Sequence, residues 1–215
     1  MTESLWQRIE QSRERWNVLD HPFYQRWSDG ELSSEELAHY AGQYRYAVAA
    51  IAAMSNYAAT VAPDWAREGL RGHAAAEAAH ISLWDSFVGA VDGDAGAAPN
   101  PETTACAEAW SARDGLLATL VRLYAIESGQ PAISRTKLKG LAEHYGIEDG
   151  PGNEYFRLHE QLDVEHADEA RALVEKLSEK LGEEALVRAA EAAEFAFKGN
   201  WELLDGVDRA FTEAA

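Results

Sequence analysis

Hydrophobic residues recur every three or four positions along almost the whole chain, which is the spacing of one face of an α-helix. Ala and Glu are abundant and β-branched runs are absent, so helix propensity agrees with this pattern. No stretch predicts a β-strand convincingly. The sequence therefore predicts an all-α protein, a bundle of about seven or eight helices. We expect these helices near residues 3–19, 21–27, 33–62, 63–91, 101–128, 133–145, 153–181 and 183–212.

Capping residues and helix breakers mark the ends of several helices. Ser33-Ser-Glu-Glu36 has the spacing of a capping box and predicts the start of a long helix. Pro101 suits the first turn of another helix, and Pro131 interrupts the pattern that follows it. Residues 92–101 are rich in Gly, Pro and Asp and form the clearest predicted loop.

Length and composition predict a single helical-bundle domain over residues 1–215, because 47% of the residues are hydrophobic and seven are Trp. The formal net charge of −18 is spread along the chain. Such a surface repels duplex nucleic acid and anionic membranes, so neither is an expected partner. The chain has no run of 18 apolar residues and no signal-peptide pattern, so we expect a cytoplasmic protein. Its helical faces and Trp residues could also support a homodimer.

One spacing of potential metal ligands, H-x3-[ED]-x2-H, occurs twice in predicted helices. Its two copies are His73/Glu77/His80 and His159/Asp163/His166. Residues at i, i+4 and i+7 fall within roughly 60° of one helix face. The outer two imidazoles are separated by roughly 10 Å along the axis, too far to serve one ion at ideal geometry. Two such helices facing each other could instead hold two ions roughly 3.5–4 Å apart.

One further carboxylate would complete this dinuclear site. Glu127 ends an otherwise apolar helical stretch, where a buried carboxylate is costly unless it has a partner such as a metal ion. Three His and three carboxylates suit iron or manganese ions that activate dioxygen, and a single cysteine offers no thiolate cluster. The predicted ligands are Glu77, His80, Glu127, His159, Asp163 and His166, with His73 as a seventh candidate that either ligates or lies beside the ligands.

Each of these residues also has a plainer interpretation. His and Glu are common on exposed helix faces, although the repeated spacing argues against that interpretation here. Cys106 could be a nucleophile, but no His is near it in sequence, which favours a small core residue. The tyrosines from Tyr40 to Tyr46 either line a pocket or simply pack between helices. Lys137 and Lys139 have the pattern of a solvated pair.

Several longer motifs resemble a known group of proteins. His21-Pro-Phe-Tyr24, then Trp27-Ser-Asp-Gly-Glu-Leu and Tyr40-Ala-x-x-Tyr44, resembles the opening of the TenA/PqqC-like, haem-oxygenase-like fold. Tyr124-Ala-Ile-Glu127-Ser-Gly-Gln-Pro131, Ser134-Arg-Thr-Lys137 and Tyr155-Phe-x-x-His159-x3-Asp163-x2-His166 resemble the dimetal branch of that fold. Within the branch, the chain is most similar to CADD-type proteins, which are linked to para-aminobenzoate synthesis. The similarity covers most of the chain.

This resemblance implies a seven-helix bundle without haem that holds two iron ions, or iron and manganese. Dioxygen would be the co-substrate, and an external reductant is expected. CADD-type proteins are thought to consume one of their own tyrosines as the aromatic precursor and to take the amine from a lysine. Tyr24 matches the sacrificed tyrosine, Lys137 matches the amine donor and Tyr40 matches another tyrosine of the pocket. The matched metal ligands are His80, Glu127, His159, Asp163 and His166.

The chain departs from the CADD-type pattern at one ligand. CADD-type sequences have their first carboxylate where this chain has His73. Glu77, three residues before His80, resembles instead the arrangement in UndA-type oxidases, which convert fatty acids to terminal alkenes. TenA-type thiamine-salvage hydrolases share the fold but use a cysteine nucleophile, and Cys106 does not match that motif.

These observations predict a non-haem dimetal oxidase or oxygenase. Its sharpest form is self-sacrificing para-aminobenzoate formation from Tyr24, with Lys137 as the amine donor. One alternative is a dimetal oxidase of an external small metabolite, such as an amino acid or a fatty acid. Another is a metal-free TenA-like hydrolase or binding protein, which would tolerate Asp163→Ala.

Overall fold

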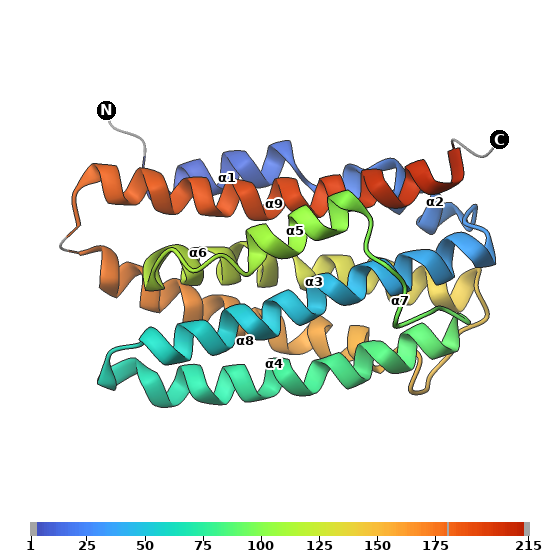
Figure 1. Ribbon diagram of the computed structural model, residues 1–215, viewed down its shortest axis with the longest axis horizontal. Coiled ribbons are helices and arrows are strands. Elements are labelled where there is room, and N and C mark those ends of the chain that lie inside the picture. Colours follow the sequence, from blue (N-terminus) through green and yellow to red (C-terminus); the bar gives the residue numbers. More distant parts are fainter. Residues whose placement is uncertain (1–3, 180, 213–215) are drawn as a thin grey trace.

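The computed structural model describes residues 4–179 and 181–212, and every regular element in these ranges is helical. The prediction of an all-α protein is therefore confirmed. The long helices run side by side and give an elongated bundle (Figure 1). The elements are α1 (Leu5–Arg15), the 3-10 helix η1 (Val18–Asp20), α2 (Pro22–Asp29), α3 (Ser34–Val61), α4 (Asp64–Ala90), α5 (Pro101–Trp110), α6 (Leu116–Glu127), α7 (Gln130–Glu143), α8 (Glu154–Ser178) and α9 (Glu183–Thr212).

The predicted capping signals act where the sequence places them. The Ser33 hydroxyl accepts a hydrogen bond from the Glu36 amide at 3.2 Å, and the Glu36 carboxylate accepts one from the Ser33 amide at 2.8 Å. This capping box starts α3. Gly30 ends α2 with φ of 72°, a left-handed conformation that glycine adopts without strain. No helix of the described part of the chain is both long and apolar enough to cross a membrane.

The helix expected from Pro101 to Ser128 is two helices, α5 and α6, so the described residues form nine α-helices where eight helical ranges were predicted. The buried guanidinium of Arg122 explains the break. It donates to the Ala112 carbonyl at 3.1 Å and pairs with Asp114, which holds residues 111–115 as a loop. Hydrophobic periodicity did not reveal the break because it continues on both sides of the loop.

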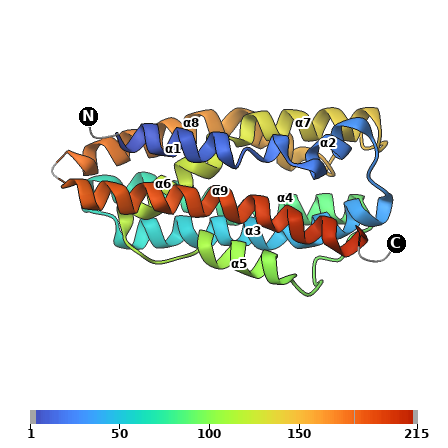
Figure 2. The ribbon, with the colours of Figure 1, turned by 90° about the horizontal axis from the view of Figure 1, so that it is seen from above.

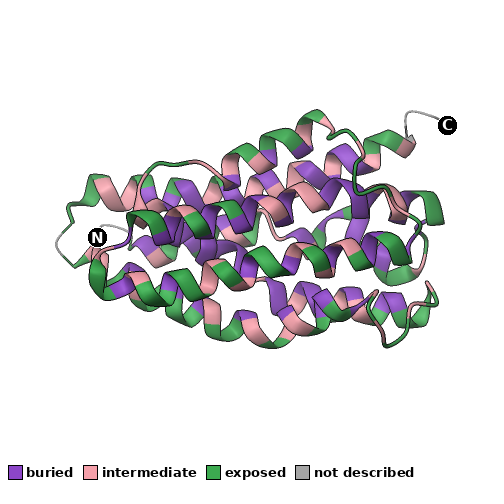
Figure 3. Cartoon of the chain, turned by 60° about the horizontal axis from the view of Figure 1, so that its bottom comes forward, coloured by how far each residue is buried: buried purple, intermediate pink, exposed green. Residues whose placement is uncertain are grey.

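The packing of the bundle brings the two motif-bearing helices together. α3 lies along α4, while α8 packs against α4, α6 and α7. Helix α9 covers α1, α5 and α6 from the other side (Figures 1 and 2). Figure 3 shows buried residues along the inward faces of these helices and exposed residues on the outside. The faces of α4 and α8 that carry the repeated His and carboxylate residues therefore meet in the interior.

Candidate metal centre

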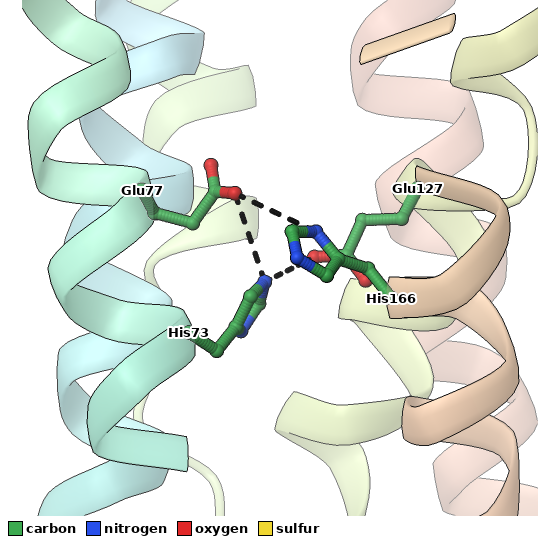
Figure 4. A group of neighbouring side chains, drawn as sticks. All are labelled: His73, Glu77, Glu127 and His166. Carbon is green, nitrogen blue, oxygen red and sulfur yellow. Dashed lines mark ion pairs between the residues drawn. The ribbon is translucent and has the colours of Figure 1, made fainter. Parts of the chain in front are cut away.

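Seven predicted ligand residues from three helices gather in one place. α4 provides His73, Glu77 and His80; α6 provides Glu127 at its last position; α8 provides His159, Asp163 and His166. Five are buried, and His73 and His166 are partly exposed at one edge. Figure 4 shows His73 and Glu77 facing Glu127 and His166 across the gap between the helices.

The ligand atoms form two groups that share one carboxylate. His73, Glu77, Glu127 and His166 each place a ligand atom within 4.8 Å of the others, and so do Glu77, His80 and His159. Oε1 of Glu77 lies 3.2 Å from Nδ1 of His80, 3.7 Å from Nε2 of His73 and 4.0 Å from Nδ1 of His166. Glu77 thus faces both groups at once.

Asp163 lies next to these groups. Its side chain is 1% exposed, and Oδ1 is 3.4 Å from Nδ1 of His166. Both of its carboxylate oxygens lack a hydrogen-bond partner within the described residues. An ionised carboxylate buried in this way is costly unless a cation or a donor compensates it.

The cluster contains more unsatisfied polar atoms than a protein interior normally tolerates. Among the described residues, eight buried ligand atoms have no hydrogen-bond partner: His73 Nε2, His80 Nδ1, Glu127 Oε1 and Oε2, His159 Nε2, Asp163 Oδ1 and Oδ2, and His166 Nδ1. Some of these atoms form close ion pairs, such as His73 Nε2 with Glu127 Oε1 at 2.9 Å. Imidazole and carboxylate groups that converge in this way, within ion-pair distance but with unsatisfied hydrogen-bonding atoms, fit a site for iron-like cations.

The orientation of His159 fits a ligand role. Its Nδ1 lies 2.7 Å from the carbonyl oxygen of Tyr155. A carbonyl only accepts hydrogen bonds, so Nδ1 carries the proton and Nε2 keeps its lone pair. Nε2 is the buried atom without a partner. A backbone carbonyl that fixes the tautomer in this way is usual for metal-binding histidines.

Charge interactions in the cluster shift several pKa values. Burial raises the pKa of Glu127, and the contact with His73 only partly opposes this. For Glu77, burial also favours the neutral form, but the nearby imidazole of His80 outweighs it and lowers the pKa. The contact with Asp163 raises the pKa of His166 to about 9. Burial lowers the pKa of His159.

A second cluster surrounds Lys137, which is 1% exposed and not the solvated lysine that its pattern suggested. Its Nζ lies 4.7–5.7 Å from the centres of five aromatic rings, those of Tyr24, Tyr40, Tyr44, Trp84 and Phe156. We call these five residues the aromatic cage. Within the described residues no carboxylate pairs with Lys137, and burial lowers its pKa well below the usual value. The amine is therefore held toward its neutral form.

The structure brings Tyr24, Tyr40 and Lys137 together, as the resemblance implied, and adds residues that the sequence analysis missed. Tyr155 stacks on His159 with ring centres 3.9 Å apart and contacts Trp84 at 4.9 Å. Burial raises the pKa of its hydroxyl, and so do the neighbouring Tyr44 and Glu77. Tyr155 thus connects the metal-ligand cluster with the aromatic cage. The sequence contains a signal that could have placed Tyr155 beside the ligands, because it lies four residues before His159 on the same helix face.

A cavity of about 310 Å³ reaches the metal-ligand cluster from the side of its partly exposed histidines. Its inner end is formed by His73, Glu127 and His166, and its walls by apolar residues of α4, α6 and α8. Trp65, which is 49% exposed, stands among the lining residues. We call this space the Trp65 cavity.

Cys106 takes no part in either cluster. Its side chain is completely buried and packs near Gly199, with 3.7 Å between Sγ and the position that a Cβ there would occupy. Burial raises the pKa of its thiol, which disfavours the reactive thiolate. This environment agrees with a small core residue.

Comparison with known proteins supports an enzyme of this kind. Residues 71–197 match a family described as iron-containing redox enzyme. The chain is 34% identical to a 4-aminobenzoate synthase of Chlamydia muridarum, over 75% of this chain and 74% of the relative. It is 29% identical to a 4-aminobenzoate synthase of Nitrosomonas europaea, over 96% and 92% of the two chains.

Solved structures share the fold at lower sequence identity. A TenA homologue from Pseudomonas syringae pv. tomato superimposes with a TM-score of 0.80 and 19% identity, over 95% of this chain and 91% of that one. A domain with a haem-oxygenase-like fold from Shewanella denitrificans gives 0.79 and 16%, over 98% and 94%. At these identities the likeness shows the fold alone, whereas the family match and the synthase relatives extend to the sequence. The chain therefore belongs to the haem-oxygenase-like family of iron-containing redox enzymes.

Proposed function

We propose that the protein is a non-haem dimetal oxidase or oxygenase, with two iron ions, or iron and manganese, held by the metal-ligand cluster. The observation that carries the proposal is the set of eight buried ligand atoms without hydrogen-bond partners. When bound, the metal pair would supply redox chemistry with dioxygen. The membership in an iron-containing redox family supports the same proposal.

The two ligand groups would hold one ion each. His73, Glu127 and His166 would serve one ion, His80 and His159 the other, and Glu77 would be shared between them. Asp163 would complete the set from beside His166. In this proposal His73 and Glu77 both ligate, because each places a ligand atom in the same group.

The aromatic cage favours self-sacrificing para-aminobenzoate formation as the specific reaction. Tyr24 would provide the aromatic ring and Lys137 the nitrogen, with dioxygen as oxidant and an external reductant supplying electrons. A neutral amine has the lone pair that such chemistry needs, and burial lowers the pKa of Lys137 and so favours the neutral form. The name of the Chlamydia muridarum and Nitrosomonas europaea relatives, 4-aminobenzoate synthase, supports this reading.

The side chains in and around the cage also exclude water and fix the position of Lys137 in this proposal. Tyr24, Tyr40 and Tyr44 are at most 2% exposed, so the cage excludes water from the reacting groups. Trp27 donates from Nε1 to the Lys137 carbonyl at 3.3 Å and helps to fix the backbone of α7 beneath the amine.

The test loads the full-length protein with iron and manganese without oxygen, then adds dioxygen and a reductant. The proposal expects about two metals per chain, 4-aminobenzoate in the supernatant and a loss of mass at Tyr24. Isotopic labelling of tyrosine carbon and lysine nitrogen should mark the product. Lys137→Met should abolish the product, whereas Lys139→Met is the matched control, since that side chain is 72% exposed on the same helix.

A second candidate is oxidation of an external small molecule, and the Trp65 cavity favours it by reaching the ligands from outside the cage. This activity would leave the mass of the protein unchanged over many turnovers and would survive Tyr24→Phe. Absence of metal binding after anaerobic addition of Fe(II) would contradict both candidates.

A further inference from the structure

A second cavity, of about 190 Å³, contains none of the metal-ligand residues in its lining. It is enclosed by α1, η1, the junction of α6 with α7, and α9. We call it the Arg13 pocket, after the cation in its wall. Its apolar lining includes three aromatic residues, Trp16, Trp110 and Phe197, and the aliphatic Ile126 and Ile133.

Unsatisfied polar atoms line this pocket. Nε1 of Trp16, which can only donate, and Oδ1 of Asn200, which can only accept, are both buried without a partner in the described part of the chain. Neither lies in the metal-ligand cluster. Buried groups of this kind each cost free energy unless a ligand or water satisfies them, so this donor and this acceptor are available to a ligand in the pocket.

Arg13 places a cation in the wall of the pocket. Its Nη2 donates to the Ser128 hydroxyl at 2.7 Å, and its guanidinium lies 5.4 Å from the centre of the Phe197 ring. The side chain is 24% exposed and pairs with Glu10 at 3.1 Å, but Glu10 is 52% exposed and can turn to solvent. Arg13 can therefore accept an anion from within the pocket.

Tyr44 separates the Arg13 pocket from Lys137. Burial raises the pKa of the Tyr44 hydroxyl, and the nearby side-chain amides of Gln130 and Asn200 oppose that rise. Its ring contacts Trp110 of the pocket at 6.4 Å, edge to face, and lies 4.7 Å from Nζ of Lys137. The pocket residue Trp110 thus contacts Tyr44, a member of the aromatic cage.

We propose that the Arg13 pocket binds a small aromatic carboxylate that carries a hydrogen-bond donor at the far end of its ring, the chemical class of 4-aminobenzoate. The carboxylate takes the Arg13 guanidinium and the Trp16 indole N–H, and the donor is accepted by Asn200 Oδ1. The assignment rests on the proposed function in one respect: a product formed in the cage passes Tyr44 and is held here before release.

Size and charge agree with this ligand. An apolar cavity of roughly 150 Å³ holds benzene, so about 190 Å³ suits one substituted ring. Aromatic walls favour a planar ring, and an arginine fork favours a carboxylate. The formal net charge of −18 opposes anion binding in general, so affinity for a carboxylate depends on the local positive charge of Arg13.

The experiment measures binding of 4-aminobenzoate to the metal-free, full-length protein by titration calorimetry, with ¹⁵N-labelled indole resonances recorded in parallel. We expect binding that shifts the Trp16 indole resonance, identified through Trp16→Phe. Arg13→Gln should weaken binding by roughly tenfold or more because it removes a charged hydrogen-bond donor. Arg15→Gln is the matched control, since it removes the same charge from the same helix at a side chain that is 63% exposed and pairs with Glu194.

Binding of related ligands tests the proposed role of Asn200 Oδ1 as a hydrogen-bond acceptor. 4-Methylbenzoate lacks the donor and aniline lacks the carboxylate, so both should bind more weakly than 4-aminobenzoate. Asn200→Leu should remove the preference for 4-aminobenzoate over 4-methylbenzoate, and thermal melting checks that this variant folds. If Asn200→Leu does not fold, the affinity of Arg13→Gln for 4-aminobenzoate and the wild-type affinities for 4-methylbenzoate and aniline still test the assignment.

Equal affinity in Arg13→Gln and Arg15→Gln, a shift at another indole only, or no binding at millimolar ligand would overturn the assignment. Product formation is measured separately by mass spectrometry. Synthesis of 4-aminobenzoate without binding at this pocket removes the pocket assignment alone. Binding here by a protein that makes no 4-aminobenzoate removes the proposed reaction and leaves an aromatic-acid site.

Discussion

Nε2 of His73 lies 2.9 Å from Oε1 of Glu127, across the gap between α4 and α6. The same imidazole nitrogen is 3.7 Å from Glu77. The residue that departs from the CADD-type pattern therefore stands inside the cluster and not on the surface. Where CADD-type sequences have one carboxylate, this chain has the imidazole of His73 and, one helical turn later, the carboxylate of Glu77. Both side chains face the gap between the helices.

In this arrangement, replacing Glu77 should cost more bound metal than replacing His73. Glu77→Gln should lose both metals because that carboxylate belongs to both ligand groups, whereas His73→Ala should retain about one metal per chain. Metal content per chain after anaerobic Fe(II) loading checks this. Glu68→Gln, an exposed change on the same helix, is the control and should bind as the wild type. Equal losses in the two cluster variants would contradict a shared role for Glu77.

Metal binding should stabilise the protein through the buried carboxylates. A ligand at a hundred times its Kd stabilises the native state by about 2.7 kcal/mol, so the melting temperature should rise when Fe(II) is added without oxygen. Asp163→Asn should remove most of this rise, while Asp168→Asn, at an exposed position on the same helix, should keep it. A full rise in Asp163→Asn would show that this carboxylate does not contribute to the site.

Lys137 should make stability depend on pH. Its pKa in the folded protein is well below the usual value because it is buried, so the unfolded chain binds one more proton between the two pKa values. The free energy of unfolding should rise with pH in that window, by at most about 1.4 kcal/mol per pH unit from this group.

Lys137→Met keeps the volume and removes the charge, so the variant should be more stable than the wild type at neutral pH. The difference should shrink as the pH approaches the ordinary lysine pKa of about 10.4. Denaturant unfolding of both metal-free proteins between pH 7 and 10.5 measures it. A constant difference across this range would mean that Lys137 stays charged in the cage.

The Trp65 cavity offers dioxygen an apolar route to the ligands, and two glycines of α4 allow a test. A Cβ at Gly69, which lines the cavity, or at Gly72, which does not, would meet no heavy atom within 4 Å. Gly69→Phe should slow oxidation of the Fe(II)-loaded protein several-fold in stopped-flow absorbance, whereas Gly72→Phe should not. Equal rates in the two variants would show that dioxygen takes another route.

Replacement by alanine should change the free energy of unfolding in opposite directions at two glycines. A Cβ at Gly140 would lie 2.5 Å from the Trp27 ring, so Gly140→Ala should destabilise by about 1–3 kcal/mol through overpacking between α2 and α7. Gly72→Ala, at an exposed position inside α4, should stabilise by roughly 0.5–1 kcal/mol because it lowers the entropy of the unfolded chain. Denaturant midpoints of the two variants provide the measurement.

Helical periodicity and the repeated spacing determined a large part of this picture from the sequence. The helix is a local structure, so His73, Glu77 and His80 share one face whatever the rest of the chain does. Capping signals such as Ser33 with Glu36 act within one turn and were equally readable. The family resemblance added Tyr24, Tyr40 and Lys137, which neither periodicity nor spacing singles out.

The tertiary structure alone decided which faces meet. The spacing could not show that Glu77 faces both ligand groups, because that depends on how α4 packs against α8. Lys137 has the pattern of a surface residue, and only the packing of α2, α3, α4 and α8 around α7 buries its amine among aromatic rings. The two cavities depend on side chains that are distant in sequence, and Arg122 breaks a helix that periodicity continues. Local hydrogen bonding fixes the helices, whereas long-range packing fixes the environment of each functional group, and that environment sets its charge and its chemistry.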